Sequence, residues 1–278
     1  MRVRFWVAVA VLGSLTWACA PAPKVSQTAP AASLNTPEQA ALVEAYRTWV
    51  LAQADDLLVR TTAFVSAVKS GNREKAQALY APTRMPYERI EPIAEALGDL
   101  DPRIDAREND VKPADWSGFH MVEKVLWSTQ PLKSVSAAAQ TLLDDVKLLR
   151  ARIETAEIKA HSLVTGAVEL LNEVSTSKVT GEEERYSHSD LWDFQANVDG
   201  SAKIWELLAP ATKAADPALA STLDERMEAL NALLALHKKG EGFKLYTDLK
   251  PEEVKALSAS VDALAEPLSK LGRLFPAE

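Results

Sequence analysis

The sequence predicts an all-α protein built from helical bundles, and three observations lead to this prediction. Apolar side chains recur at the spacing of amphipathic helices along most of the chain. No segment alternates apolar and polar residues convincingly, and runs of β-branched residues are short. Aromatic residues make up only 6% of the 278 residues. Helical bundles are the simplest way to bury so many amphipathic stripes.

The first 35 residues are expected to direct export of the chain. Arg2 and Arg4 precede an apolar run, and the single cysteine, Cys19, follows that run. This is the order of an export signal, and the position of Cys19 predicts lipidation after lipoprotein-type cleavage. We therefore expect a signal peptide over 1–19 and a flexible tether, rich in Ala, Pro, Ser and Thr, over 20–35. The protein would then be periplasmic and anchored to a membrane by lipid.

The folded body is expected to begin at Thr36. There Thr-Pro-Glu-Gln combines a helix N-cap, a proline in the first turn and a capping-box glutamine. Apolar residues keep helical spacing up to Val68, and Gly71 is expected to end this helix. A second helix is expected over 73–98, uneven because prolines interrupt it, and an acidic irregular stretch over 99–115.

The later helices follow from apolar periodicity and from start signals. Pro251, followed by two glutamates, opens the last helix in the favoured way. The expected ranges are 118–127, 134–158, 161–174, 189–208, 217–237 and 251–271. These make about eight helices in all. Two stacked helical bundles, over residues 36–158 and 159–278, fit the chain length better than one bundle.

Composition narrows the functional classes. The formal net charge of −8 argues against a nucleic-acid binder, because contact with phosphates requires a basic surface. The single cysteine excludes an internal disulfide framework and any zinc or iron–sulfur site built from several cysteines. No glycine-rich phosphate loop of the Walker or dinucleotide-binding type occurs in the sequence.

The candidate chemistry centres on two residues of a short predicted helix. His120 and Glu123 are three positions apart, so an imidazole nitrogen and a carboxylate share one helix face and are able to coordinate one metal ion. Glu88 and Glu91 repeat this spacing in the second helix, and the acidic stretch could return Asp105 to His120. One imidazole with several carboxylates suits iron, manganese or zinc.

The same residues are also compatible with purely structural roles. His120 could be a hydrogen-bonded histidine packed under Trp116 and Trp127, and the acidic stretch could be solvated surface. Spacing alone does not decide between a metal ligand and a structural histidine.

A second polar cluster spans residues 182–190 and contains Glu183, Glu184, Tyr186 and His188. It could form another wall of the same site, or its acids could be solvated while Ser187 or Ser189 caps the following helix. The Gly-x-Ser-x-Gly turn of many hydrolases is absent.

Three stretches carry a resemblance to a known family. They cover 87–95 with 100–108, 118–124, and 181–198, which reads Gly-Glu-Glu-Glu-Arg-Tyr-Ser-His-Ser-Asp-Leu-Trp-Asp-Phe-Gln-Ala-Asn-Val. They resemble the imelysin-like domain of the EfeO family of periplasmic iron-uptake proteins, and the resemblance extends over roughly residues 38–275. The family's usual cupredoxin domain is expected to be missing here, so the similarity is to its short form, often called EfeM.

The resemblance implies a two-lobed, all-helical fold with a cleft between the lobes. It also implies a metal site at His120 and Glu123, completed by Glu88 and Asp105. The further candidates for the site or its cleft are Glu91, Asp101, Glu184, Tyr186 and His188.

The function implied by the resemblance is that of an exported iron-binding protein, and not of an enzyme. The protein would capture Fe2+ or Fe3+ in the periplasm and pass it to a membrane permease, with a haem-dependent peroxidase as a further partner. The net acidity is consistent with the attraction of cations.

Two alternatives belong to other functional classes. An imelysin-like metallopeptidase would use His and Glu ligands, but the usual signature is His-Glu-x-x-His, whereas Lys124 follows Glu123 here and no second histidine comes after it in the helix. A binding protein for an acidic polysaccharide such as alginate would require a basic cleft, and no dense cluster of Lys and Arg stands out in the sequence.

Overall fold

The computed structural model describes residues 36–275 of the chain. Over this range the protein has nine α-helices, five short 3-10 helices and one hairpin of two-residue strands, so the all-α prediction is confirmed. The expected signal peptide, tether and lipidation site at Cys19 lie outside the described residues. Among helices of the described range, none is long and apolar enough to cross a membrane.

The elements have the following bounds. The α-helices are α1 (Thr36–Lys69), α2 (Arg73–Ile90), α3 (Leu100–Asp105), α4 (Phe119–Leu126), α5 (Ser136–Thr155), α6 (Ala160–Thr176), α7 (Asp190–Ala215), α8 (Pro217–Ala235) and α9 (Pro251–Ser269). The 3-10 helices are η1 (Glu91–Leu97), η2 (Leu132–Val135), η3 (Lys178–Thr180), η4 (Tyr246–Asp248) and η5 (Lys270–Arg273). The strands β1 (Lys238–Lys239) and β2 (Gly242–Phe243) pair antiparallel.

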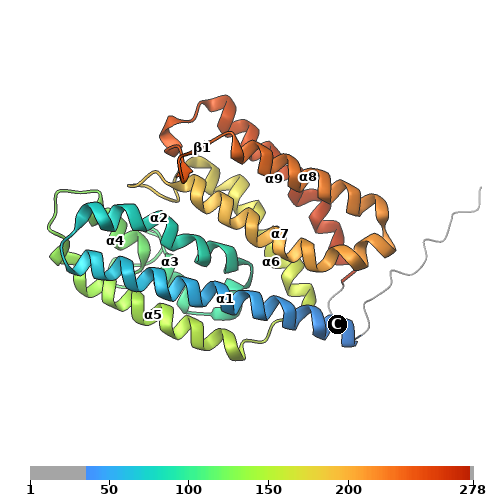
Figure 1. Cartoon of the computed structure of the whole chain (residues 1–278), viewed down its shortest axis with the longest axis horizontal. Helices are drawn as coiled ribbons and strands as arrows, with labels where there is room; N and C mark the ends of the chain where they lie inside the picture. Colours follow the sequence, from blue (N-terminus) through green and yellow to red (C-terminus); the bar gives the residue numbers. More distant parts are fainter. Residues whose placement is uncertain (1–35, 276–278) are drawn as a thin grey trace, which may run out of the picture. The chain divides into compact units, whose positions relative to one another are not determined.

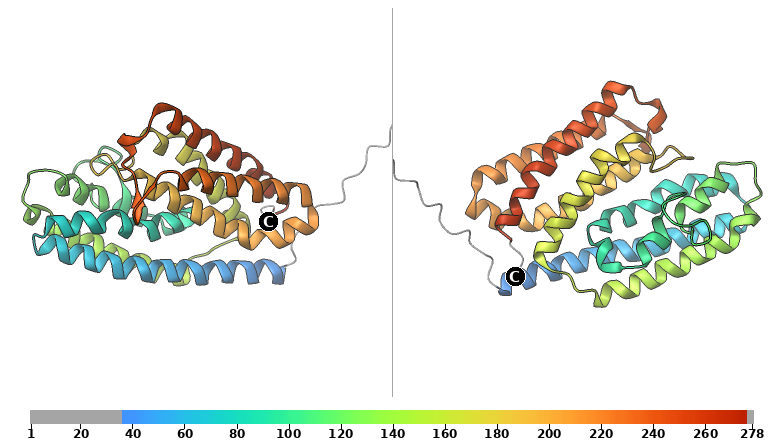
Figure 2. Two further views of the ribbon diagram at one scale, coloured as in Figure 1. Left: turned by 45° about the horizontal axis from the view of Figure 1, so that its top comes forward. Right: turned by 180° about the vertical axis from the view of Figure 1, so that it is seen from behind.

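The helices form two sets of neighbours. In the first set α1 packs along α2 and α5, and the short helices α3 and α4 pack on α5 (Figure 1). In the second set α6 packs on α9 and α7, and α8 packs on α7 and α9 (Figure 2). The helices α2 and α7 are in extensive contact and join the two sets. The division into bundles over 36–158 and 159–278 stays a prediction, and so does a cleft between two lobes.

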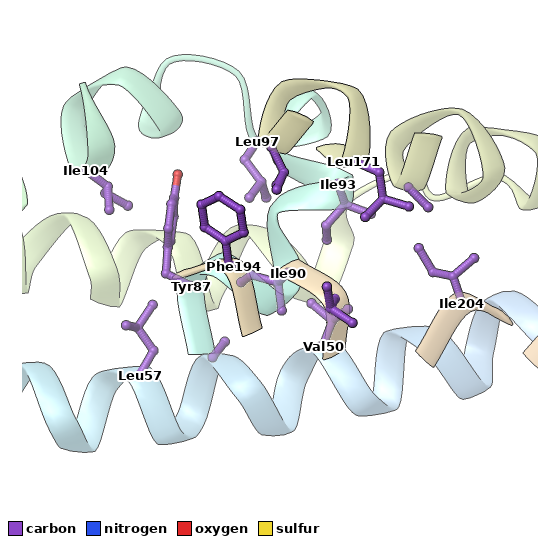
Figure 3. Close-up of a cluster of buried hydrophobic side chains, with 14 of the residues drawn as sticks. Val50, Leu57, Tyr87, Ile90, Ile93, Leu97, Ile104, Leu171, Phe194 and Ile204 are labelled. Atoms are coloured by element: carbon purple, nitrogen blue, oxygen red, sulfur yellow. The ribbon is translucent and has the colours of Figure 1, made fainter. Parts of the chain in front are cut away.

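The apolar core runs through both sets of helices without a break. Figure 3 shows Val50 of α1, Ile90 of α2 and Phe194 of α7 lying together, and all three are fully buried. Leu171 of α6 and Ile93 of η1 belong to the same cluster. Burial of each side chain of this size stabilises the fold by about 1.5–3 kcal/mol, so the core holds the helices that carry the site in fixed positions.

The contact between α2 and α7 is unusually close at one glycine. A Cβ atom added to Gly200 of α7 would clash with the carbonyl oxygen of Arg89 in α2. One turn earlier on α7, the side chain of Asn197 donates a hydrogen bond to the carbonyl oxygen of Glu88 at 3.1 Å. The polar faces of α2 and α7 therefore meet directly.

Three local features differ from the predicted elements. The stretch expected to be irregular contains α3, because Leu100 and Ile104 are fully buried although acids and a proline surround them. The second helix changes to 3-10 geometry at Glu91, next to a proline. The helix expected to end at Leu208 continues through Pro210, because its far end packs along α8.

Candidate metal centre

The helix α4 carries the predicted pair, and its start is fixed by Gly118. This residue has a φ of 90°, and a Cβ atom there would clash with the carbonyl oxygen of Ile104, so glycine is required. His120 is 2% exposed and Glu123 is fully buried. The Nδ1 atom of His120 lies 3.3 Å from Oε2 of Glu123, so the two side chains share one helix face, as their spacing predicts.

Arg84 of α2 is fully buried at the centre of the site. Its guanidinium group contacts the carboxylates of Glu88, Asp105, Glu183, Glu184 and Asp193. Its Nε atom is 2.5 Å from Oε1 of Glu184, and the group also lies over the Phe119 ring, 5.5 Å from the ring centroid. Burial opposes the charge of Arg84, but Asp105 and the other acids raise its pKa well above the usual value.

The segment between η3 and α7 brings Glu183 and Glu184 to the site, and both are buried. Its backbone is held by Glu123, whose Oε1 atom accepts the N–H group of Tyr186 at 3.0 Å and that of Ser187 at 2.7 Å.

The carboxylate of Glu123 therefore interacts with several hydrogen-bond donors at once. Burial alone would raise its pKa, but its hydrogen bonds with His120 and with the Ser187 backbone are among the contacts that lower it. Its carboxylate is therefore ionised, and it fixes both the imidazole ring and the segment that follows η3.

The two ring nitrogens of His120 face different acids. The Nε2 atom lies 3.5 Å from Oδ1 of Asp105 and 3.7 Å from Oε1 of Glu183, and it is buried without a hydrogen-bond partner. The Nδ1 atom faces Glu123, with Glu184 nearby. The potential ligand atoms of Asp105, His120 and Glu183 all lie within 4.8 Å of one another, and the same is true of His120, Glu123 and Glu184. We refer to these five residues, Asp105, His120, Glu123, Glu183 and Glu184, as the His120 cluster.

Acids outnumber the cations that contact them around the His120 cluster. Lys178 of η3 is 1% exposed, with Nζ 2.9 Å from Oε2 of Glu88 and 3.0 Å from Oε2 of Glu91. Arg107 is half-buried and reaches Glu183 at 2.8 Å. Together with Arg84, these cations contact six acids that are buried or nearly so. The acids are Glu88, Glu91, Asp105, Glu183, Glu184 and Asp193.

The buried acids fall into two groups by the direction of their pKa shifts. Burial raises the pKa values of Glu184 and Asp193 well above the usual value despite the charge of Arg84. Asp105 and Glu183 behave in the opposite way. Burial is outweighed for Asp105 by Arg84, which lowers its pKa, and for Glu183 by Lys178 and His120, which lower its pKa to about 2. Asp105 and Glu183, the acids beside Nε2, are therefore ionised and suited to bind a cation.

The predicted site residues fall into two groups. Those that come together in the His120 cluster are His120, Glu123, Asp105 and Glu184. Glu88 lies beside the cluster, bound by Arg84, Lys178 and Asn197.

The remaining predicted residues lie further out. Glu91 is bound by Lys178, and Asp101 accepts a hydrogen bond from the Tyr87 hydroxyl at 2.6 Å. Tyr186 contributes its backbone, and its hydroxyl donates to Glu108 at 2.5 Å. His188 is half-buried, its backbone lies in the left-handed region with a φ of 56°, and its N–H group donates to the backbone carbonyl oxygen of Glu184 at 2.8 Å.

Sequence reasoning missed three residues of the site. They are Arg84, Lys178 and Asp193. A weak signal was present in the i, i+4 spacing of Arg84 and Glu88, which allows a helical ion pair. Nothing local indicates that this pair is buried, because its other partners come from distant segments.

The fold agrees with comparisons to known proteins. A profile of the imelysin family, Peptidase M75, matches residues 42–271. The chain belongs to the imelysin family and, within it, to the EfeM/EfeO type.

Two relatives illustrate the similarity. An EfeM/EfeO family lipoprotein of Staphylococcus haemolyticus (strain JCSC1435) is 45% identical over 231 residues, which are 81% of this chain and 80% of the relative. The iron uptake system component EfeO of Escherichia coli (strain K12) is 45% identical over 233 residues, which are 82% of this chain and 62% of the relative. The chain thus spans about three fifths of the length of that EfeO protein.

Proposed function

We propose that the protein is an exported component of an iron-uptake system that binds iron for delivery to a membrane permease. The observation that carries this proposal is the buried Nε2 atom of His120, which faces Asp105 and Glu183 and makes no hydrogen bond. A metal cation there would replace the proton of the imidazole, and the adjacent carboxylates of Asp105 and Glu183 would balance its charge. The 45% identity to a protein named as an iron uptake component supports iron as the cargo.

The proposed binding site uses Nε2 of His120 with Asp105 and Glu183 as first ligands. Glu88 is proposed as a further ligand, because Arg84 and Lys178 link it to the same acids. A ligating imidazole usually donates its other N–H group to a carboxylate, and Glu123 is placed to accept it.

The donor set is suited to iron among the common metals. It offers one imidazole and several carboxylates, which bind Fe2+ well and also accept Mn2+ or Zn2+. Preference for iron would then depend on which ion the periplasm supplies and on the permease that receives it.

The proposed partners and location are those that the resemblance to the family implies. We propose a lipid anchor at Cys19, a permease as the recipient of the iron, and a haem-dependent peroxidase of the same system as a further partner. A relative named as a lipoprotein supports the anchor.

Cargo binding is favoured over peptidase activity. A catalytic zinc site needs a general base and an open coordination position. The residue after Glu123 is Lys124, which is paired with Glu108, and no histidine follows it on α4. A polysaccharide such as alginate is disfavoured, because the acids around the cluster would repel its carboxylates.

The proposal is tested by calorimetry and elemental analysis of the purified protein with Fe2+, Fe3+, Mn2+ and Zn2+. The variant is His120→Ala, which leaves Glu123 to hold the following segment. The matched control is Glu228→Gln, which changes an exposed acid of α8. We expect iron binding by the parent and the control and its loss in His120→Ala, with helical content retained. Equal binding by a folded His120→Ala protein would overturn the proposal.

A further inference from the structure

A pocket of about 620 Å³ opens on the surface between α6 and η1. Acidic side chains dominate its wall, and none of the described residues that line it is Lys or Arg. The ionisable residues of the wall are Glu91, Asp101, Glu157, His161, Glu169 and Glu173. Such a wall raises the local concentration of cations and repels anions.

A chain of contacts leads from this pocket to the His120 cluster. Glu91 lines the pocket, and its carboxylate oxygens are 3.0 and 3.2 Å from Nζ of Lys178. The same Nζ atom lies 3.8 Å from Oε1 of Glu183. That oxygen is 3.7 Å from Nε2 of His120. One ammonium group therefore separates the pocket wall from the proposed metal ligands.

Contacts hold the backbone that carries Lys178 in place. The η3 backbone is fixed, because the hydroxyl of Tyr246 donates to the carbonyl oxygen of Val179 at 2.7 Å. Gly181 follows with a φ of 76°, and the Tyr246 ring leaves no room for a Cβ atom there. The lysine side chain has four rotatable bonds, so it is the adjustable part of this segment.

The wall of the pocket is rigid where α6 meets η1. A Cβ atom added to Gly166 of α6 would clash with the carbonyl oxygen of Pro92 in η1. The two walls are thus in backbone contact, so this part of the pocket is expected to keep its shape.

We propose that this pocket is the entrance through which a metal cation reaches the His120 cluster, and that the Lys178 side chain is the movable partition between them. The inference rests on the proposed function. An arriving cation replaces the ammonium group beside Glu91 and then Glu183, and the ammonium group swings aside. The carboxylates exchange one positive charge for another, so the buried acids are never left without a counter-charge.

The test obstructs the pocket without touching the ligands. Thr165 lines the pocket and is exposed, so a cysteine there can be labelled with a bulky, uncharged maleimide. Ser221→Cys on the exposed face of α8 is the matched control. Both variants are made in the full chain with Cys19→Ser. Loading with Fe2+ is followed anaerobically by timed addition of a chromogenic chelator.

We expect the labelled Thr165→Cys protein to load at least about tenfold more slowly than the labelled control, with the same final occupancy. Equal loading rates in two proteins that bind Fe2+ would overturn the inference alone. Failure of the unlabelled parent to bind Fe2+ would overturn the proposed function, and the inference with it.

A second variant tests the partition itself. Lys178→Met keeps the length of the side chain and removes the ammonium group. We expect this protein to load Fe2+ several-fold faster than the parent, whatever its melting temperature. A lower melting temperature with an unchanged loading rate would show that Lys178 serves the fold only.

Discussion

His120 and Glu123 are joined across one turn of α4, with Nδ1 3.3 Å from Oε2. The other oxygen of Glu123 accepts two backbone N–H groups from the segment that supplies Glu183 and Glu184. The two residues of the sequence motif therefore have different tasks. Glu123 orients the imidazole and fixes the following segment, and His120 presents Nε2 to the remaining acids.

Glu123→Gln should weaken metal binding without abolishing it. A residue that orients a metal-binding histidine typically contributes about 10–100-fold to affinity. The glutamine should also lower the melting temperature, because its side chain meets three donors with only one acceptor oxygen. Calorimetry with Fe2+ and thermal unfolding measure both effects.

Asp105→Asn is the companion variant, because it alters a proposed ligand on the Nε2 side. Its affinity should fall further than that of Glu123→Gln. Unchanged binding by Asp105→Asn together with complete loss in Glu123→Gln would place the metal on Nδ1.

Metal binding should strengthen as the pH rises. Burial and the charge of Arg84 lower the pKa of His120, but contacts with Asp105, Glu123 and Glu183 outweigh them and raise it well above the usual value. The metal-free imidazole is then protonated at neutral pH, and an arriving metal must displace its proton. Calorimetry in two buffers of different ionisation enthalpy should reveal proton release. Binding heats that are independent of the buffer would contradict this expectation.

Arg84→Met should destabilise the metal-free protein by about 3–5 kcal/mol, because it leaves buried carboxylates without their counter-charge. Urea unfolding measures the change. Arg60→Met is the matched control, since Arg60 pairs with Asp56 on the exposed face of α1, and it should cost less than about 1 kcal/mol. Similar losses in both variants would mean that the acids around Arg84 are already neutral.

The sequence predicted the parts of this protein that local rules determine. Apolar spacing located the long helices, and the stop at Gly71 is followed by α2, whose cap is the side chain of Asn72. The helix α3 was missed, because its only two apolar residues stand among acids and a proline and give no clear helical pattern. Their burial is decided by contacts with distant helices. The helix α7 was predicted to end before Pro210, although packing on α8 sustains it through this residue.

The residues of the candidate site also fall into those that the sequence could predict and those that it could not. His120, Glu123 and Asp105 were predictable, since a spacing of three residues and a returning acidic segment are features of the chain itself. Arg84 and Lys178 were not, because a buried cation among acids arises only where α2, η3 and α7 converge. A single sequence gives no sign of that convergence.

Gly200→Ala should destabilise the fold by about 1–3 kcal/mol, because the added methyl group would push α7 away from the Arg89 carbonyl of α2. Gly272→Ala is the matched control, since a Cβ atom there would meet nothing within 4 Å. Metal affinity should fall in Gly200→Ala as well, because α2 and α7 carry Arg84 and Asp193. Equal unfolding free energies for the two variants would mean that the helices can separate freely.

His237 should make the protein less stable as the pH falls below about 6.5, the usual pKa of an unfolded histidine. The side chain is 2% exposed, neither ring nitrogen makes a hydrogen bond, and burial followed by the charge of Lys244 lowers its pKa. The unfolded chain therefore takes up a proton at a higher pH than the folded one, so its contribution to stability is present above that pH and is lost below it. Urea unfolding of the parent and of His237→Gln at several pH values between about 5 and 8 isolates this effect, and the variant should have the flatter dependence. Identical slopes would show that the ring of His237 does not titrate differently in the two states.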